Sequence, residues 1–445
     1  MSEKPKESYV FHRAEAPIYV SHGKGVYVWD SNGRRYLDGS GGPLCVGIGH
    51  GVDEVVEKMK IQAGKIAFAH AMHLTCEPVE KFAEKVSELC PGNLKKVFPC
   101  SGGSEAMESA IKLARQYFLE KGEPRRYKTI SRWLSYHGNT LGALSASGHP
   151  MRREKYVPLL LDFPHIAPAY CYRCWFGKEY PSCDLECARD LERAIKTAGP
   201  EYVSAFVAEP IVGSTLGSVP APKEYFKIIK EICDKFNILL ISDEVQTGFG
   251  RTGKNFGIEH YGVVPDMMIC AKGIASGYAP LGALIASTEI FEPFKKSLFV
   301  HGFTYGGNPL SCAVGLAVLE YLMDHKLISR VGNIEKTLFE GLEEAKDKHR
   351  IVGDVRGKGL MAGIEFVKDK RTKEIFPTKM GVGSSVVEQC FKNSLLVYCG
   401  GPSIEGLAGD QIQVAPMLIS TEDQVREITS IVDKSIEEVE KQIKA

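Results

Sequence analysis

Short runs of consecutive apolar residues recur through the middle of the chain. Residues 203–208, 238–242 and 267–271 are such runs, and none of them alternates between apolar and polar positions. Strands that are buried on both faces of a parallel sheet have this pattern, because helices cover both faces. Segments with strand and helix patterns also alternate from Lys96 to about Leu319. The pattern therefore predicts an α/β fold built on a mainly parallel sheet.

The pattern changes after Arg330. Residues 335–349 have the apolar spacing of an amphipathic helix, and residues 421–444 predict a charged terminal helix. Three short segments between these helices have strand patterns, at residues 361–366, 395–398 and 411–414. The C-terminal part is therefore expected to form an α+β unit.

Near the N-terminus, residues 23–38 predict a hairpin whose turn is Ser31-Asn-Gly33.

Composition and charge narrow the class of protein. The 445 residues are 44% apolar and 25% charged, which is ordinary for a globular chain. Basic and acidic residues balance at 55 each, so we expect neither a nucleic-acid nor an anionic-membrane partner. No apolar stretch approaches membrane-spanning length, and Met-Ser-Glu-Lys-Pro-Lys-Glu at the N-terminus lacks the apolar core of a signal peptide. A cytoplasmic protein is predicted.

The chain has 13 cysteines, which a cytoplasmic location predicts to be thiols. Four of them, Cys171, Cys174, Cys183 and Cys187, have the spacing C-x2-C-x8-C-x3-C. This spacing is compatible with a structural zinc ion, with two disulfides or with four packed thiols. No metal site is predicted, because the chemistry that the other motifs indicate needs no metal.

Lys272 and Asp243 carry the most informative chemistry. Each residue follows one of the apolar runs, and Lys272 also precedes a glycine-rich stretch. A lysine amine can form a Schiff base with an aldehyde, and a buried aspartate can keep a pyridine nitrogen protonated. These are the two side chains that pyridoxal 5'-phosphate (PLP) requires of a protein. For either residue alone, the favoured interpretation is a structural one, a lysine that caps a surface loop or an aspartate that caps a helix.

A phosphate site is predicted upstream. The strand pattern 96–100 runs into Ser101-Gly-Gly-Ser-Glu-Ala106 and then into a helical pattern. A helix N-terminus presents backbone N–H groups and a positive dipole end to an anion. Gly102 and Gly103 allow close approach of the backbone to phosphate oxygens, and the Ser104 hydroxyl can donate. This is not the spacing of a P-loop, because no Lys-Ser/Thr pair follows the glycines.

The remaining candidates also follow predicted strands. Tyr136-His137-Gly138 comes after a strand pattern at 127–131, and an aromatic ring there can stack on a flat heteroaromatic ring. Glu209 follows the run 203–208. Ligands of open α/β sheets lie beyond the carboxyl ends of the strands, so these side chains are expected to meet at one edge.

These motifs together resemble the class III aminotransferases, also called the ω-aminotransferase group, which are PLP enzymes of fold type I. The resemblance runs from about Tyr19 to the C-terminus. Its most specific part is Leu-Leu-Ile-Ser-Asp-Glu-Val-Gln-Thr-Gly-Phe-Gly-Arg-Thr-Gly at 239–253, followed by Pro-Asp-Met-Met-Ile-Cys-Ala-Lys-Gly at 265–273. Ser-Gly-Gly-Ser-Glu-Ala, Tyr-His-Gly, Ala-Glu-Pro-Ile and Phe-Thr-Tyr occur in the order that the family has.

The resemblance implies a role for each candidate. Lys272 forms the Schiff base and Asp243 holds the pyridine nitrogen, and both are catalytic. Gln246 is implied to bond the ring hydroxyl, and Val245 to pack on the face opposite Tyr136. Thr304 is implied to reach the phosphate of a neighbouring subunit, which requires a homodimer or a larger homo-oligomer. The full cofactor-binding set is Gly102, Gly103, Ser104, Tyr136, His137, Glu209, Asp243, Val245, Gln246, Lys272 and Thr304.

The resemblance also implies a division of the chain. Residues 61–325 would form the large PLP-binding domain. Residues 1–60 would join residues 326–445 in a small domain beside it.

The substrate is less well defined. Many family members bind a keto-acid carboxylate with an arginine in the C-terminal segment, but this sequence has no arginine between Arg371 and Arg426. Arg356 is a candidate anchor, although a structural role at the start of a strand is the simpler interpretation. An amine pocket could be shaped by Leu44, Cys45, Phe68, His70 and Tyr305.

The leading hypothesis is transfer of an amino group from an amine or ω-amino acid to a keto acid, pyruvate or 2-oxoglutarate. The motifs are equally compatible with a PLP-dependent racemase, epimerase or aminomutase. They are also compatible with a PLP-dependent ammonia-lyase. A non-enzymatic binding protein is disfavoured, because Lys272 and Asp243 are both present.

Overall fold

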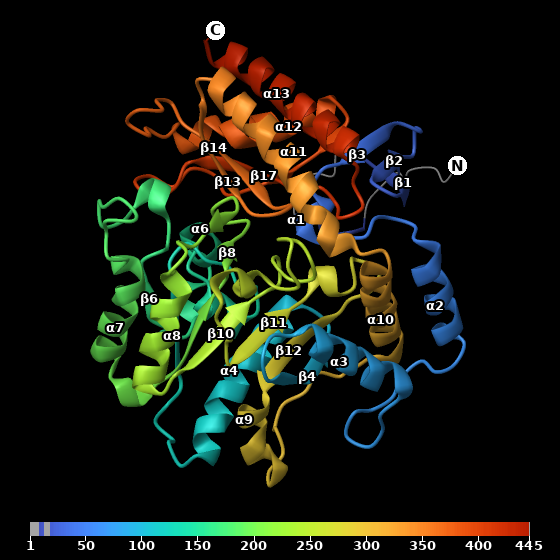
Figure 1. The fold of residues 1–445 in the computed structure, drawn as a ribbon, viewed down its shortest axis with the longest axis vertical. Helices are drawn as coiled ribbons and strands as arrows, with labels where there is room; N and C mark the ends of the chain where they lie inside the picture. The colour runs from blue at the N-terminus through green and yellow to red at the C-terminus, as the bar shows by residue number, and fades with distance from the viewer. Residues whose placement is uncertain (1–8, 13–17, 445) are drawn as a thin grey trace.

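The computed structural model describes residues 9–12 and 18–444 and is organised around a seven-stranded sheet (Figure 1). The strand order is β4 (Leu94–Cys100), β12 (Gly282–Ser287), β11 (Met267–Cys270), β10 (Leu239–Asp243), β7 (Val203–Ala208), β5 (Lys128–Arg132) and β6 (His165–Ile166). Only β12 runs antiparallel to its neighbours in this sheet, so β4 points in the same direction as the other five strands. The predicted α/β fold with a mainly parallel sheet is confirmed.

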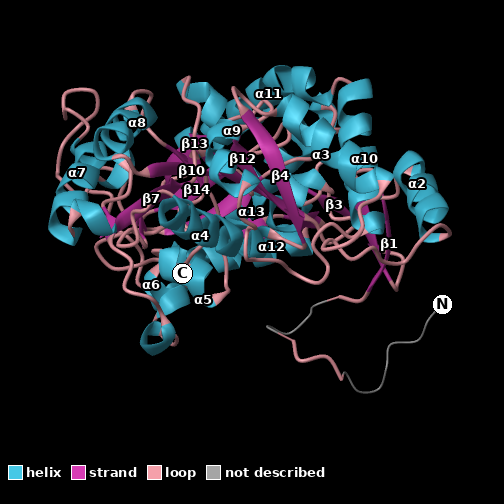
Figure 2. Ribbon diagram, turned by 90° about the horizontal axis from the view of Figure 1, so that it is seen from below, coloured by secondary structure: helices cyan, strands magenta, loops and turns pink. Residues whose placement is uncertain are grey.

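Helices cover both faces of the sheet, as the unbroken apolar runs predict. In β7, Phe206 and Ala208 pack into the cluster that contains α8 (Tyr225–Phe236). The alternate residues Ala205 and Val207 pack into the cluster that contains α4 (Gly103–Glu120). Seen from below in Figure 2, the strands lie between these helices. Other helices of this region are α3 (Glu77–Leu89), α5 (Leu141–Ala146), α6 (Pro150–Arg153), α7 (Glu186–Ala198), α9 (Thr288–Phe291) and α10 (Pro309–Asp324).

A second unit of helices and strands lies above the large sheet in Figure 1. Its helices are α11 (Leu327–Lys348), α12 (Val382–Lys392) and α13 (Glu422–Lys444). One of its sheets is antiparallel, with the order β13 (Val352–Gly357), β14 (Ala362–Phe366), β17 (Asp410–Val414) and β16 (Tyr398–Cys399). The other has the order β1 (Val20–Lys24), β2 (Tyr27–Asp30), β3 (Arg35–Asp38) and β15 (Leu395–Leu396).

The N-terminal strands therefore belong with the C-terminal part of the chain. β3 pairs in parallel with β15, and Val26 and Leu37 share one buried cluster with Val414 and Ile428. The helices α1 (Gly41–Leu44) and α2 (Asp53–Ala63) follow β3 and lead into the region of the large sheet.

Two predicted elements differ in extent. The predicted hairpin is a three-stranded meander, with its turn at residues 31–33 as expected. The helix predicted at 335–349 begins at Leu327, because Leu327, Val331, Ile334 and Leu338 continue its buried face toward the N-terminus.

The structure bears on the predictions about membranes, cysteines and metal ions. No helix among the described residues is long and apolar enough to cross a membrane. The N-terminal heptapeptide, on which the prediction about a signal peptide is based, lies outside the described residues. All 13 cysteines are free thiols. The described residues also contain no group of three or more side chains arranged to hold a metal ion.

Candidate active site

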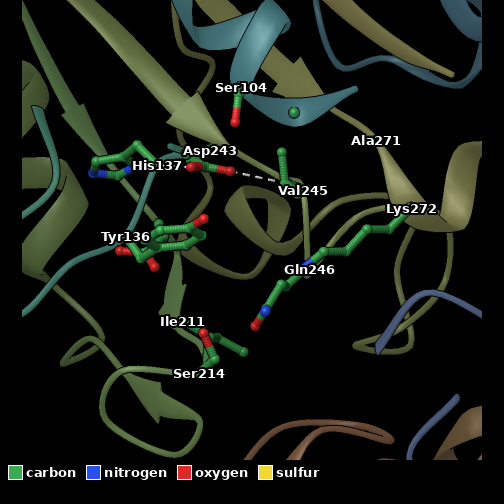
Figure 3. Close-up of a pocket in the computed structure, with 13 residues that line it drawn as sticks. Ser104, Tyr136, His137, Ile211, Ser214, Asp243, Val245, Gln246, Ala271 and Lys272 are labelled. Carbon is green, nitrogen blue, oxygen red and sulfur yellow. Dashed lines mark hydrogen bonds and ion pairs between the residues drawn. The ribbon is translucent and has the colours of Figure 1, made fainter. Parts of the chain in front are cut away.

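A pocket opens beyond the carboxyl ends of the parallel strands (Figure 3). It contains about 640 Å³ of space, including some open to solvent. Each wall comes from a segment that directly follows a strand of the large sheet or packs against one. The lining residues are Gly103, Ser104, Tyr136, His137, Gly138, Glu209, Ile211, Ser214, Asp243, Val245, Gln246, Ala271 and Lys272.

Lys272 projects into this pocket from the turn after β11. Its φ of 50° lies in the left-handed region, which is unfavourable for a residue with a side chain. The carbonyl of Lys272 accepts hydrogen bonds from the backbone N–H groups of Ala275 and Ser276, so the turn holds it in place. Such strained positions occur where the surrounding structure fixes them.

The amine of Lys272 is held in a form that suits reaction with an aldehyde. Burial lowers its pKa from 10.5 to about 8, and the positive charge of Arg152 acts in the same direction. The ionised forms of Cys45, Asp243 and Glu209 would oppose this shift, but they do not cancel it. A neutral amine is the nucleophilic form, so a large neutral fraction is present near pH 8.

Asp243 is the last residue of β10 and is buried at the base of the pocket. Its Oδ2 lies 2.7 Å from Nδ1 of His137, and its Oδ1 accepts a hydrogen bond of 3.0 Å from the backbone N–H of Val245. The backbone N–H of His137 donates to Ser147 Oγ at 2.8 Å. These contacts fix the orientation of the carboxylate while leaving it lone pairs for a further donor.

The N-terminus of α4 forms another wall. No side chain caps this helix, so its first N–H groups lack intrahelical and side-chain partners. A Cβ on Gly103 would lie 3.2 Å from both methyl groups of Val245, which shows how closely the helix start approaches that side chain. Ser104 Oγ accepts a hydrogen bond from the Asn139 N–H at 3.0 Å, and its own proton remains free to donate.

Tyr136, Gln246 and Glu209 complete the pocket. Tyr136 and Gln246 are half-buried, whereas Glu209 is buried. Gln246 Oε1 and Glu209 Oε2 are buried without a hydrogen-bond partner among the described residues. Burial raises the pKa of the Glu209 carboxyl, and the charge of Asp243 adds to the increase, whereas His137 and Arg132 oppose it.

The structure brings ten of the eleven predicted cofactor residues together, and nine of these ten line the cavity. Gly102 is the residue before α4 and is adjacent to the lining residue Gly103. Thr304 is the exception within one chain. It is exposed and lines a separate surface hollow with Met72, Leu74 and Phe303.

The candidate amine-pocket residues separate into two groups. Cys45 is close enough to Lys272 for their charges to act on each other, and Leu44 beside it is buried. Phe68 contacts His70 and Tyr305, with ring centroids 6.3 and 6.4 Å apart, away from the lining of the Lys272 pocket.

The interpretation of Arg356 as a carboxylate anchor is wrong. Only 8% of its side chain is exposed, and its guanidinium pairs with Asp354 at 2.9 Å and with Glu365 at 2.8 Å. Its Nε donates to the carbonyl of Gly217 at 3.0 Å. All three guanidinium nitrogens of Arg356 therefore have partners within the chain, so the arginine is structural. The sequence could not show this, because Glu365 is brought beside it only by the pairing of β13 with β14.

The four clustered cysteines lie near one another. Burial raises the pKa of Cys187 to about 12, and the neighbouring thiols of Cys171, Cys174 and Cys183 add to the effect. They do not form a ligand set for a metal ion in the described part of the chain.

Sequence reasoning missed Ile211, Ser214 and Ala271 as lining residues. Ala271 precedes Lys272, so its position follows from the lysine. Ile211 and Ser214 follow Glu209 by a few residues, and neither an apolar isoleucine nor a single serine indicates a binding site by its residue type.

The pocket fits PLP by its own chemistry. A lysine amine and an anchored carboxylate face the same space, and an uncapped helix N-terminus is available for a phosphate. The unpartnered oxygen atoms of Gln246 and Glu209 supply further polar contacts. The mainly parallel sheet, with this set at the carboxyl ends of its strands, defines a PLP-dependent enzyme of fold type I.

The chain belongs to the class III aminotransferases, since residues 10–436 match the model of the family Aminotransferase class-III. The uncharacterized aminotransferase YodT of Bacillus subtilis is 38% identical over 428 residues, which are 96% of each chain. Putrescine–pyruvate aminotransferase of Pseudomonas aeruginosa is 36% identical over 431 residues, 94% of this chain and 90% of the relative. The PLP-bound crystal structure of an amine transaminase from an uncultivated Pseudomonas species has a TM-score of 0.90 at 31% identity and covers 98% of this chain and 99% of that one.

Proposed function

We propose that this aminotransferase moves an amino group from an amine or ω-amino acid to a keto acid, pyruvate or 2-oxoglutarate. The observation that carries the proposal is the presence of Lys272 and Asp243 in one pocket, with the lysine pKa lowered to about 8. A relative that is named for putrescine and pyruvate supports an amine donor and a keto-acid acceptor.

Lys272 is proposed to carry the cofactor covalently and to move the protons of the reaction. When bound, PLP supplies an aldehyde that reacts with amines and a ring that accepts electron density. Once displaced by the substrate amine, the neutral Nζ of Lys272 would take a proton from the substrate carbon and, as the ammonium, would deliver it to a different carbon, as amino-group transfer requires. Its lowered pKa places both protonation states within reach near neutral pH.

Asp243 is proposed to hold a proton on the ring nitrogen of the cofactor. Its carboxylate is buried and oriented by His137 and by the Val245 N–H, so it presents a fixed negative charge. That charge favours the protonated ring nitrogen, in which the ring accepts electrons most readily. His137 thereby acts as a positioning residue for Asp243.

The rest of the cofactor set is proposed to bind and orient PLP. Gly102, Gly103 and Ser104 would hold the phosphate at the start of α4. Tyr136 and Val245 would enclose the ring, with Gln246 at its hydroxyl and Glu209 on the substrate side. These roles rest on the common pocket of the residues and on the unpartnered polar atoms that line it.

A homodimer is proposed to complete the phosphate site. Thr304 is exposed on its own chain and outside the pocket, as a residue that serves a partner subunit would be. Met72 and Leu74, which line the same hollow as Thr304, are 69% and 58% exposed. Leu298 and Val300, on either side of its lining residue Phe299, are 73% and 85% exposed. Exposed apolar side chains around one hollow are typical of a protein–protein interface.

A half-reaction screen tests the proposed function. Candidate amines, including putrescine and 4-aminobutyrate, are added to the PLP-loaded protein while the cofactor absorbance is followed. At least one amine should convert the aldehyde form to the amine form, and pyruvate or 2-oxoglutarate should restore it. Isomerisation of one substrate without acceptor consumption would favour a racemase or an aminomutase instead, and ammonia release without an acceptor would favour a lyase.

A further inference from the structure

Most arginines around the active site are already occupied. Arg132 donates to the backbone carbonyl of Glu209 and lies 3.9 Å from its carboxylate. Arg356 pairs with two carboxylates, and Arg153 and Arg251 donate to backbone carbonyls. Arg152 differs from all four. Among the described residues it has no carboxylate within 4.0 Å, and its one hydrogen-bond contact is a long one of 3.5 Å to Ser214 Oγ.

Arg152 lies at the edge of the Lys272 pocket. Its guanidinium carbon is 4.2 Å from the ring centroid of Tyr136, and both Tyr136 and Ser214 line the pocket. Its positive charge also lowers the pKa of Lys272, so the charge acts across the cavity. The side chain is half-buried, which reduces the competition of water for its donors.

The surroundings identify the side of the pocket that Arg152 faces. A Cβ on Gly213, the residue before Ser214, would overlap Oε1 of Gln246. The turn that contacts Arg152 is therefore packed against the Gln246 side chain. Figure 3 shows Ser214 and Gln246 at the same end of the pocket, on the far side from Ser104. Arg152 is thus at the end opposite the proposed phosphate site.

The glycine-rich C-terminal segment packs against the segments that carry Arg152 and Ser214. A Cβ on Gly401 would lie 3.2 Å from Nε2 of His149 and 3.3 Å from the carbonyl oxygen of Thr215. This C-terminal stretch has no arginine between Arg371 and Arg426. The α6 segment therefore brings a guanidinium to a place that the C-terminal segment reaches without one.

His149 does not replace Arg152 as a cation. Burial lowers its pKa to about 4, and the charge of Arg152 adds to the decrease. The imidazole is therefore neutral near pH 7, and neither ring nitrogen has a partner among the described residues. Arg152 is left as the cation at this end of the pocket that no carboxylate of the described chain neutralises.

We propose that Arg152 binds the carboxylate of the keto-acid acceptor. The inference rests on the proposed function and adds the residue that recognises the acid. A guanidinium fork binds a carboxylate through two parallel charge-assisted hydrogen bonds, and Ser214 beside it supplies a further hydroxyl. The substrate class is therefore a small 2-oxo acid whose carboxylate points away from the phosphate end of the cofactor.

The experiment compares acceptors with and without a carboxylate. Enzyme carrying the amine form of the cofactor is mixed with pyruvate or with propanal, and the return of the aldehyde form is followed. Loss of a charged hydrogen bond should lower kcat/KM for pyruvate by about 10- to 150-fold in Arg152→Gln. The value for propanal should change by less than about 3-fold, and Arg152→Lys should be intermediate for pyruvate because it keeps the charge without the fork.

Lys155→Gln is the matched control. It removes one positive charge from the same segment at an exposed position outside the pocket, so both acceptors should react as with the unmodified protein. Equal losses for pyruvate and propanal in Arg152→Gln would assign Arg152 a general structural role. Unchanged kinetics with pyruvate would place the anchor elsewhere. Either result overturns the inference.

A binding measurement separates this inference from the proposed function. Propionate carries a carboxylate but cannot accept an amino group, and its binding to the PLP form can be read from the cofactor spectrum. It should bind the unmodified protein and Lys155→Gln, and bind Arg152→Gln at least about 10-fold more weakly. If no keto acid accepts an amino group, the proposed function fails, whereas the propionate result still decides the role of Arg152.

Discussion

At the scale of single residues, the reactivity of Lys272 depends on how burial changes the pKa of its amine. An exposed lysine near pH 7 is almost fully protonated and unreactive toward an aldehyde. Burial lowers the pKa of Lys272 to about 8, because the pocket stabilises the charged amine less well than water does. The negative charges of Asp243 and Glu209 limit this shift, so the amine remains able to carry a proton.

The pH dependence of cofactor attachment follows from this pKa. Only the neutral amine attacks the aldehyde, so the rate of PLP capture by the apoenzyme should rise with pH and level off above about 8. Stopped-flow absorbance at a series of pH values measures this midpoint, and Lys272→Ala should show no covalent capture. A midpoint near 10.5, the ordinary value for lysine, would contradict the tuning. In Arg152→Gln the midpoint should move upward, because a charge that lowers the pKa is removed.

Asp243 is expected to act through its charge rather than its shape. Asp243→Asn keeps the size of the side chain but removes the negative charge beside the proposed ring nitrogen. Turnover should fall roughly 10²- to 10³-fold, comparable to the loss of one preorganised electrostatic contact. Steady-state kinetics checks this, with Asp162→Asn as a control that removes an exposed carboxylate outside the pocket. Turnover close to that of the control would mean that another group holds the ring nitrogen.

The sequence identifies a candidate site residue most clearly where a reactive side chain stands at the end of an apolar run. Asp243 and Lys272 each end an apolar run, and a run buried on both faces fixes where the strand ends. Arg152 could not be predicted in this way, because Arg153 follows it and the two are chemically identical. Arg153 donates to the carbonyls of Ser145 and Ser147, whereas Arg152 faces the pocket. Only the tertiary placement of α6 distinguishes them.

At the scale of elements, the start of α4 forms a wall of the pocket and is the site proposed for the phosphate. Gly103 allows the helix to begin against Val245, and the uncapped N–H groups remain available. The start of α4 therefore lies between the proposed phosphate end of the pocket and Val245, the side chain proposed to contact the cofactor ring.

Gly103→Ala should weaken cofactor binding. Its Cβ would lie 3.2 Å from the Val245 methyl groups and push that side chain toward the cavity. Overpacking of this kind costs roughly 1–3 kcal/mol, so the Kd of PLP should rise by about tenfold or more. Fluorescence titration of the apoenzyme measures the change.

Gly332→Ala in α11 is the control for this prediction. An added Cβ there meets no atom within 4 Å, and alanine favours the helix. Its PLP affinity should be that of the unmodified protein. An unchanged Kd in Gly103→Ala would show that the wall is less constrained than the contacts indicate.

Element boundaries show what local patterns miss. The strands at 203–208 and 239–243 follow closely from their apolar runs, because burial on both faces leaves no other pattern. The helix α11 begins eight residues before the predicted start, because the burial of Leu327 and Val331 depends on tertiary packing with C-terminal residues such as Val414 and Met417. The pairing of β3 with β15 joins residues more than 350 positions apart, which no local pattern reveals.

At the scale of the whole molecule, we propose that residues 61–325 form a large cofactor domain and that residues 1–60 and 326–445 form a small domain. Val26 and Leu37 share a buried cluster with C-terminal residues, which supports this grouping for the part of the chain that the structure describes. Arg251 donates to the carbonyl of Pro416 and so connects the large unit with the small one beside the pocket.

Assembly should control cofactor retention. If Thr304 completes the phosphate site of a partner, dilution to the monomer should release PLP, and both changes should share one midpoint. Analytical ultracentrifugation with absorbance at the cofactor band measures them together. Thr304→Ala should weaken PLP binding while leaving the dimer intact. A monomer that keeps PLP and full activity would contradict a shared site.

The most direct test of the central claim follows the nitrogen atom. An amine that reacts in the half-reaction screen is prepared with nitrogen-15 and incubated with the PLP-loaded protein and pyruvate or 2-oxoglutarate. The account predicts that nitrogen-15 appears in alanine or glutamate in proportion to the amine consumed, and that Lys272→Ala transfers none. Release of the label as ammonia, or its retention in a rearranged form of the donor, would contradict amino-group transfer by this site.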